Sequence, residues 1–216
     1  MTEREHQRNH AGALLYDRLA PEFVSTATTP LASHVHAPGL WPSASLALRH
    51  LHRLPGAAIG LWATHPLGHI AIDPREVARY ESGRLQWRNL DSRAVLVLTP
   101  VVVQEDARRF WEIVGAWLDH WLGCDGAAEG AWLSEGGSPT QPQRLLEATV
   151  ALQAILDRGY AHVLLGTDEP RTLFARAVSL ALIDPRALST ADPHLARWLR
   201  GTLLNEAWWG RLASQL

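Results

Sequence analysis

The chain carries eleven histidines, and two of them have the spacing of a metal site. His65 and His69 stand four residues apart, which on a helix would project both imidazoles from one face, as zinc sites require. Asp73 could add a carboxylate to the pair. Pro66 and Gly68 oppose a helix between them, so we expect loop histidines beside short strands. A metal site made of His65, His69 and Asp73 stays open as an alternative.

Other familiar catalytic motifs are absent from the sequence. There is no dinucleotide-binding glycine motif, no Walker loop and no serine nucleophile elbow. The glycine-rich segment 123–137 follows a predicted helix, so we expect a surface loop. Cys124 is the single cysteine and has no neighbouring base to activate it, which excludes an internal disulfide and disfavours a thiol nucleophile.

Charge and hydropathy exclude two classes of partner. The formal net charge is −2, whereas a general nucleic-acid-binding protein needs a basic surface. No apolar run approaches the roughly 20 residues that span a bilayer, and the N-terminus is too polar for a signal peptide. We therefore expect a cytoplasmic protein that binds neither nucleic acid nor membrane.

The residue periodicity places a small sheet before a helical half. A helix is expected within the first twenty residues and another over 43–54, where Pro55 ends it. Short apolar runs predict strands at 57–63, 69–73 and 94–98. From Glu105 onward the pattern is helical. This order predicts an α+β fold with a single domain over 1–216, in which 1–100 holds the sheet and 101–216 the helical half.

Four helices are expected in the second half. They are 105–122, closed by Gly123; a helix after a capping box of Thr140 and Gln143, ending at Gly159; a helix capped by Thr167 or Asp168; and one opened by Asp192-Pro193 that covers Leu195 to Trp209. A stripe of Trp111, Trp117 and Trp121 on the first of them is typical of core. Later tryptophans either close the core or cover a partner; they are Trp198, Trp208 and Trp209.

The segment Arg109–Asp125, RFWEIVGAWLDHWLGCD, resembles the metal-binding helix of zincin-type metallopeptidases of the anthrax lethal factor kind. That helix usually carries the motif H-E-x-x-H. Alignment on Leu118–His120 and on Leu122–Gly123 puts the two histidine ligands at Glu112 and Ala116 and the general base at Ile113.

The resemblance continues downstream and covers about residues 90–205. Residues 159–177 are similar to the family's second block, in which an active-site tyrosine precedes the helix with the third zinc ligand. Tyr160 matches that tyrosine, and the ligand position falls on Thr172. The run AVLVLTP stands where the family's sheet precedes the metal helix.

This resemblance implies a zincin-like fold without its metal. In H-E-x-x-H, two imidazoles hold zinc while the glutamate deprotonates the bound water. Alanine cannot ligate, isoleucine cannot accept a proton and threonine is a poor zinc ligand, so no zinc and no other cofactor are expected. The vestigial cleft would comprise Glu112, Ile113, Ala116, Asp119, Tyr160, Glu169 and Thr172.

Relocated ligands give an alternative for the same cleft. Glu112, Asp119 and Glu169 could hold a harder cation, together with His120 or His162. The competing expectation is that Glu112 and Asp119 are ordinary polar residues paired with Arg108 or Arg176.

The leading hypothesis is a zincin-fold protein that has lost zinc and peptidase activity and acts as a binding or regulatory module. Its vestigial cleft would hold a peptide or a small-molecule ligand, and a homo-oligomer is left open. One alternative is a metal-dependent hydrolase or peptidase with relocated ligands. Another is a helical protein-interaction module unrelated to zincins.

Overall fold

A computed structural model describes residues 41–65, 68–87, 90–124 and 130–215. The helix expected within the first twenty residues lies outside these ranges. The chain divides into two compact units, Met1–Asp106 and Ala107–Leu216, close to the expected division between a sheet-bearing half and a helical half. The fold is α+β, with a small sheet followed by helices. A single domain over the whole chain stays a prediction.

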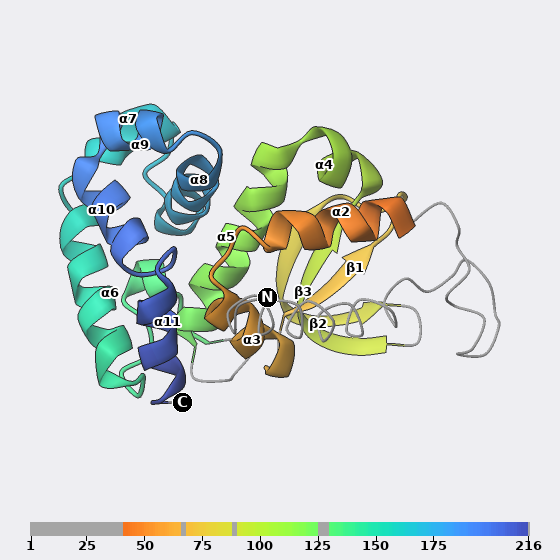
Figure 1. Cartoon of the computed structure of the whole chain (residues 1–216), viewed down its shortest axis with the longest axis horizontal. Helices are drawn as coiled ribbons and strands as arrows, with labels where there is room; N and C mark the ends of the chain where they lie inside the picture. The colour runs from red at the N-terminus through yellow and green to blue at the C-terminus, as the bar shows by residue number, and fades with distance from the viewer. Residues whose placement is uncertain (1–40, 66–67, 88–89, 125–129, 216) are drawn as a thin grey trace, which may run out of the picture. The chain divides into compact units, whose positions relative to one another are not determined.

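The first unit contains the sheet and three helices in the described part of the chain (Figure 1). Its elements are α2 (Trp41–Leu51), α3 (Gly56–Thr64), β1 (His69–Ile72), β2 (Arg79–Trp87), β3 (Leu90–Leu98) and α4 (Pro100–Glu105). Two contacts tie α2 to α4: Gln104 Nε2 donates to Ser43 Oγ over 2.9 Å, and His50 Nε2 lies 3.1 Å from the carbonyl oxygen of Val103.

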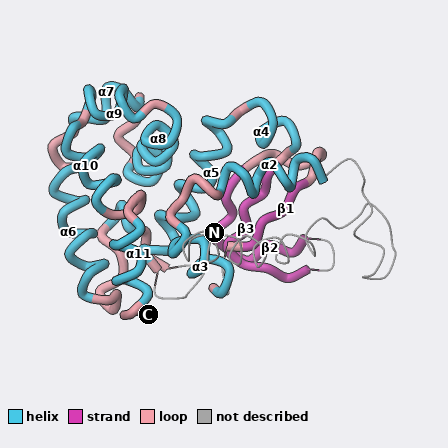
Figure 2. Tube along the Cα trace, viewed as in Figure 1, coloured by secondary structure: helices cyan, strands magenta, loops and turns pink. Residues whose placement is uncertain are grey.

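The sheet has the strand order β1-β3-β2 (Figure 2). β1 pairs with β3 in parallel, with His69 opposite Val95, and β2 pairs with β3 antiparallel with an irregularity between Glu81 and Arg84. The apolar run Ala94–Leu98 is buried throughout, as expected for the central strand of a sheet. The predicted strands at 69–73 and 94–98 are confirmed.

The strand predicted over 57–63 is wrong, because this segment forms the helix α3. It is apolar on nearly all sides, and in such a segment periodicity cannot distinguish a strand from a buried helix. Tertiary packing decides the outcome: Ile59 and Trp62 are buried, and Trp62 Nε1 donates to the carbonyl oxygen of Gly68 over 2.7 Å.

Strand β2 has no counterpart among the predicted elements. Its sequence, RYESGRLQW, is too polar to register as a strand and contains a glycine. It forms because β3 offers it a hydrogen-bonding edge, which is information from outside the segment.

The second unit is helical (Figure 1). Its elements are α5 (Ala107–Gly123), the 3₁₀ turn η3 (Leu133–Glu135), α6 (Gln143–Leu156), α7 (Tyr160–Leu165), α8 (Pro170–Ile183), α9 (Pro185–Ala191), α10 (Pro193–Gly201) and α11 (Glu206–Ala213). The four predicted helices correspond to α5, α6, α8 and α10, but the last is interrupted before α11. None of the described helices is long and apolar enough to cross a bilayer.

Three helices in this unit start with an acidic residue followed by proline. Glu169, Asp184 and Asp192 each accept backbone N–H bonds at the first turn of α8, α9 and α10. Glu169 therefore takes the capping role predicted for Thr167 or Asp168. The capping box of Thr140 and Gln143 does not form: Pro142 occupies the cap position of α6, and Thr140 Oγ1 bonds to Ser138 Oγ.

Tryptophans form much of the second unit's core. Trp117 stacks on Trp121 at 4.6 Å between ring centroids, and Trp121 stacks on Trp209 at 5.5 Å. Trp198 and Trp208 are also buried, at 8% and 5% exposure. The predicted core stripe is confirmed, and the suggestion that the C-terminal tryptophans cover a partner is wrong because they lie inside the unit.

Candidate ligand-binding site

Helices α5 and α8 pack closely and run antiparallel. A Cβ atom built on Gly115 would lie 2.9 Å from Ala175 Cα, so only glycine permits this approach of the two backbones. Ser179 Oγ donates to the carbonyl oxygen of Arg108 over 2.9 Å. Arg108 precedes Gly115 whereas Ser179 follows Ala175, which fixes the antiparallel direction. The two helices that the resemblance brings together are therefore direct neighbours.

A pocket of about 210 Å³ lies beside this helix pair. Its lining residues are Arg108, Leu165, Arg176, Ser179, Leu180 and Ile183. They come from the first turn of α5, the last residue of α7 and the C-terminal half of α8. Aliphatic side chains and two arginine residues thus line one small, mainly apolar cavity.

The predicted zinc positions lie on the same side of the helix pair as this pocket. Glu112 and Ala116 follow Arg108 along α5 at intervals of four residues, and Thr172 precedes Arg176 by four on α8. Residues four apart share a helix face. We call this side, made by Arg108, Glu112 and Ala116 with Thr172 and Arg176, the pocket side of the pair.

The residues at these positions do not fit zinc. The two carboxylate oxygens of Glu112 accept hydrogen bonds from Arg108 Nε and Arg109 Nη1, each over 3.3 Å. The charge of Glu112 is therefore already paired with arginine. Ala116 offers no ligand. Ile113 is only 2% exposed and belongs to the core rather than to a cleft, since it points away from the face of Glu112.

Metal ligands do not gather elsewhere in the part of the chain that the structure describes. No group of three histidine, cysteine, aspartate or glutamate side chains is placed to hold an ion there. The pairing expected between Glu112 and Arg108 is confirmed.

Asp119 lies on α5 but is buried beneath the segment that follows the helix. Its two carboxyl oxygens accept the backbone N–H and the hydroxyl of Ser134 over 2.7 and 2.6 Å. Burial raises the pKa of Asp119 to about 8, although the bonds from Ser134 oppose the shift; Glu135 raises the pKa further and Arg171 lowers it. Both carboxyl oxygens of Asp119 are thus engaged by Ser134 inside the unit.

Residues 130–142, which we call the connecting segment, are fastened to the end of α5. Ser138 donates its backbone N–H to the carbonyl oxygen of Gly123 over 2.8 Å, and Gln141 Nε2 donates to the carbonyl oxygen of Leu122. Leu133 and Ser134 are buried. The surface loop predicted over 123–137 is wrong for these residues, because Gly123 leaves room for backbone where a side chain would clash.

An ion pair covers the buried carboxyl. Arg171 donates two bonds of 2.8 Å to Glu135 and lies 4.4 Å from the ring centre of Trp132. Glu169 accepts the backbone N–H groups of Arg171 and Thr172. Burial raises the pKa of Glu169, but hydrogen bonding by the Thr172 side chain and by these backbone groups holds that pKa below the ordinary value. Glu169 is thus a helix cap rather than a free ligand.

Tyr160 does not join the pocket side. It is 57% exposed at the start of α7 and stacks on His194 of α10, with 6.5 Å between ring centroids. The pocket is lined by Leu165 at the opposite end of α7. The interpretation of Tyr160 as the remnant of a catalytic tyrosine is therefore not supported by its position. His162 also lies on α7.

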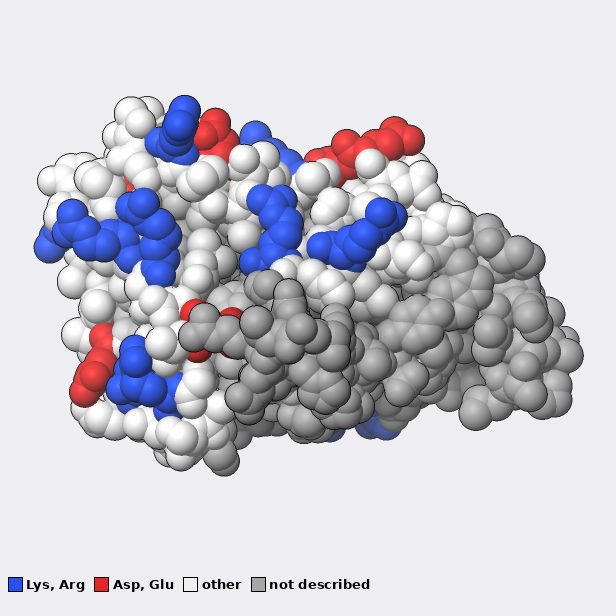
Figure 3. Space-filling model, viewed as in Figure 1, with Lys and Arg blue, Asp and Glu red and all other residues white. Residues whose placement is uncertain are grey.

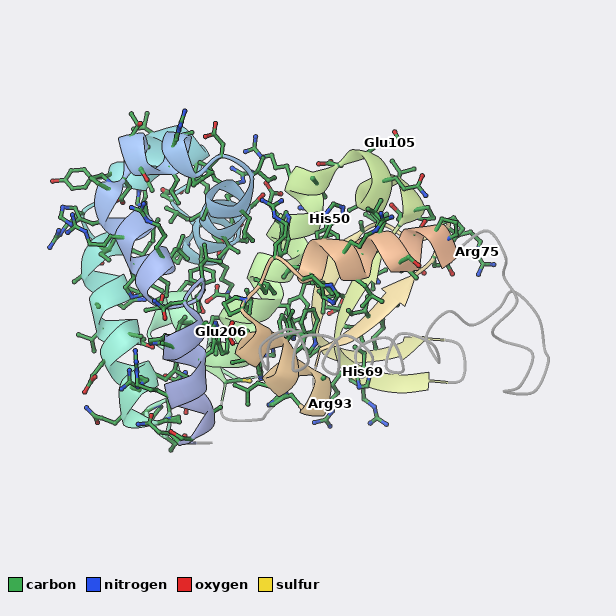
Figure 4. All side chains as sticks on the ribbon, in the orientation of Figure 1. His50, His69, Arg75, Arg93, Glu105 and Glu206 are labelled. Carbon is green, nitrogen blue, oxygen red and sulfur yellow. The ribbon has the colours of Figure 1, made fainter. Side chains whose placement is uncertain are left out.

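Of the alternative ligands His65, His69 and Asp73, the first unit places His69 and Asp73 at opposite ends of one strand. His69 begins β1 and Asp73 follows its end, a span of roughly 13 Å at the usual rise of a strand. Asp73 instead accepts two side-chain bonds from Arg75, of 3.1 and 3.0 Å. Figure 4 shows His69 and Arg75 at opposite ends of this strand. His69 and Asp73 are therefore too far apart to bind the same metal ion.

Sequence reasoning missed the pocket itself. Its α8 residues, Arg176, Ser179 and Ile183, recur at intervals of three and four residues and so share a face, which is a signal that the sequence contained. The contribution of Leu165 depends on how α7 folds back and left no local signal.

Comparisons of this chain with protein-family models, with curated proteins and with solved structures found no match.

Proposed function

We propose that this protein is a binding module rather than a metallopeptidase, and that it holds a small ligand in the pocket beside α5 and α8. The observation that carries this proposal is the cavity of about 210 Å³ next to the helix pair that resembles the zincin metal site. Ligand pockets usually measure about 300–1,000 Å³, so this one suits a small molecule or a single anchoring side chain of a peptide.

The scaffold part of the proposal is a zincin-like arrangement without zinc. It is supported by the close packing of α5 on α8 and by the common side of Glu112, Ala116 and Thr172. The side chains themselves argue against catalysis by zinc, since Glu112 is held by two arginines and Ala116 has no donor atom.

Binding is tested by nuclear magnetic resonance with three six-carbon probes: hexanoate, hexanamide and hexylamine. We expect at least one probe to shift the signals of Leu165, Leu180 and Ile183. An Ile183→Ser variant should weaken that effect, whereas Val150→Ser, which alters an exposed valine of α6 away from the pocket lining, should leave it unchanged. If none of the probes shifts these signals, the proposed function fails.

The scaffold is tested by restoring the ligands on the pocket side. The triple variant Glu112→His, Ala116→His and Thr172→Glu should bind one zinc ion, because it recreates two imidazoles four residues apart and a facing carboxylate. Ile113 is left unchanged because it is buried. A variant that folds but takes up no zinc would contradict the zincin-like scaffold without affecting the pocket.

A separate experiment tests the prediction that the native protein holds no zinc. Protein purified without chelator should contain no stoichiometric zinc by elemental analysis and should cleave no peptide. A full equivalent of zinc that is lost in the Glu112→Ala variant would overturn this part of the proposal.

A further inference from the structure

Two arginines line the pocket, and each donates only part of its guanidinium N–H groups to the protein. Arg176 donates Nη1 to the carbonyl oxygen of Leu165, and Arg108 donates Nε to Glu112. A guanidinium has five N–H donors, and these are the bonds that the two side chains donate within the described part of the chain. Most of their hydrogen-bonding capacity therefore remains available to a ligand.

The main chain and neighbouring side chains set the position of both guanidinium groups. Ser179 holds the backbone of Arg108 against α8, and the bond to Leu165 fixes Arg176 between α7 and α8. Arg108 itself is 67% exposed, which leaves its guanidinium open to solvent at the edge of the cavity. Both arginines thus stand on the packed α5–α8 pair, with Arg108 exposed and Arg176 partly buried.

The remaining lining is apolar. Leu165, Leu180 and Ile183 supply it, and Ile183 is 43% exposed. A ligand that satisfies the whole cavity needs a negatively charged group for the arginines and a short hydrocarbon part for the three aliphatic side chains.

We propose that the pocket binds a carboxylate that bears a short apolar chain, with the carboxylate between Arg108 and Arg176 and the chain against Leu165, Leu180 and Ile183. This inference rests on the proposed function and names the ligand class of the same site. Planar carboxylates match the fork of a guanidinium, which explains the preference for arginine donors.

The charge pattern agrees with a small anion rather than a polyanion. On the face drawn in Figure 3, the arginines over the helices of the second unit stand in separate groups and form no continuous stripe. A nucleic acid needs a basic track to displace its counterions, whereas one carboxylate needs only a local pair.

Two sources can present this chemistry: a free aliphatic acid, or the C-terminus of a peptide that ends in an apolar residue. Hexanoate represents the first, and a tetrapeptide with a free C-terminal leucine represents the second. Its C-terminal amide is the matched control, because the amide keeps the side chain and removes the charge.

The test is a titration of the full chain followed by nuclear magnetic resonance. We expect hexanoate to bind with a Kd on the order of 1 mM, and hexanamide and hexylamine to bind at least tenfold more weakly. Arg176→Gln and Arg108→Gln should each weaken hexanoate binding at least tenfold. Arg197→Gln removes the same charge from an exposed site on α10 and should have no effect.

The outcomes separate the two proposals. If hexanamide binds as tightly as hexanoate and depends on Ile183, the pocket binds ligands but the carboxylate inference is wrong. If no probe binds, the proposed function fails as well. Should Arg176→Gln unfold the protein, the Arg108→Gln variant decides, because its side chain is exposed. Tighter binding of the leucine peptide than of hexanoate, lost in its amide, identifies a peptide C-terminus as the source.

Discussion

The two ends of the α5–α8 pair differ in how their charged side chains are placed. At the pocket end, Arg108 and Arg176 are cations with accessible donors beside aliphatic side chains. At the other end, which we call the closed end, Asp119 is buried, carries a raised pKa and is covered by the connecting segment. One pair of helices therefore combines a fixed, water-excluding anchor with an open cationic site. The closed end joins α5 to the connecting segment through Asp119 and Ser134, and Glu135 of that segment pairs with Arg171 of α8.

The largest predicted effect is the pH dependence of the closed end. Asp119 keeps its proton in the folded protein up to about pH 8, while the same group in the unfolded chain ionises near pH 4. The folded state binds more protons in this window, so the free energy of unfolding falls as pH rises. The contribution is fully present below about pH 4 and is lost as pH rises through 8, at up to about 1.4 kcal/mol per pH unit.

An Asp119→Asn variant isolates this group. Asparagine keeps an acceptor for the Ser134 N–H but does not titrate, so the variant should gain stability over the wild type as pH rises from 4 to 8. Urea unfolding of both proteins across this range measures the difference. Other charges face Asp119 from η3 and α8, namely Glu135 and Arg171, and both remain in each protein. Parallel pH profiles would show that Asp119 is ionised in the folded state.

The second effect concerns the fit of the connecting segment on α5. A Cβ atom on Gly123 would lie 2.2 Å from the backbone nitrogen of Leu133 and 2.4 Å from the carbonyl carbon of Trp132. Backbone cannot yield as a flexible side chain does, so Gly123→Ala should cost about 3 kcal/mol or more in unfolding free energy.

Gly210→Ala is the matched control for this change. The added methyl group would meet nothing within 4 Å in the middle of α11, and alanine favours a helix over glycine by about 1 kcal/mol. The control should therefore be neutral or stabilising in thermal unfolding. Equal losses in both variants would mean that the close contact at Gly123 does not exist.

A third, smaller effect tests the junction between the two ends. Gly115→Ala would place a methyl group 2.9 Å from Ala175 Cα and 3.2 Å from Val178 Cβ, while gaining about 1 kcal/mol of helix propensity. We expect a net loss of about 1–2 kcal/mol. Hexanoate binding should weaken at the same time, since Arg108 and Ser179 depend on this packing. Unchanged binding in a destabilised variant would uncouple the pocket from the helix crossing.

The two ends also differ in how far the sequence predicts them. The helices α5 and α8 follow from their apolar periodicity, and Asp192 before Pro193 marks a helix start unambiguously. The predictions failed where the structure of a segment depends on contacts with other parts of the chain. Trp62 packs in a helix where its neighbours suggested a strand, and β2 forms only because β3 provides an edge.

Candidate site residues show the same limit. The positions that the alignment chose, Glu112 and Thr172, both fall on the pocket side of the helix pair, because residue spacing alone decides a helix face. The alignment could not show that Glu169 caps α8 or that Tyr160 stacks on His194, since both depend on tertiary neighbours. Leu165 enters the pocket for the same reason, through the turn between α7 and α8.

The smallest predicted effect on stability belongs to Glu112 at the pocket end. Its ion pairs with Arg108 and Arg109 are largely exposed on the arginine side, and such pairs contribute about 0–1 kcal/mol. Glu112→Gln should thus change the unfolding free energy by less than about 0.5 kcal/mol. Hexanoate binding should instead strengthen about two- to fivefold, because the Glu112 carboxylate competes with the ligand for Arg108. Asp106→Asn, which removes an equal charge outside the pocket lining, serves as the control in the same titration. Weaker binding in Glu112→Gln would mean that this carboxylate orients Arg108 for the ligand rather than competing with it, and would assign to the old ligand position a supporting role in the new site.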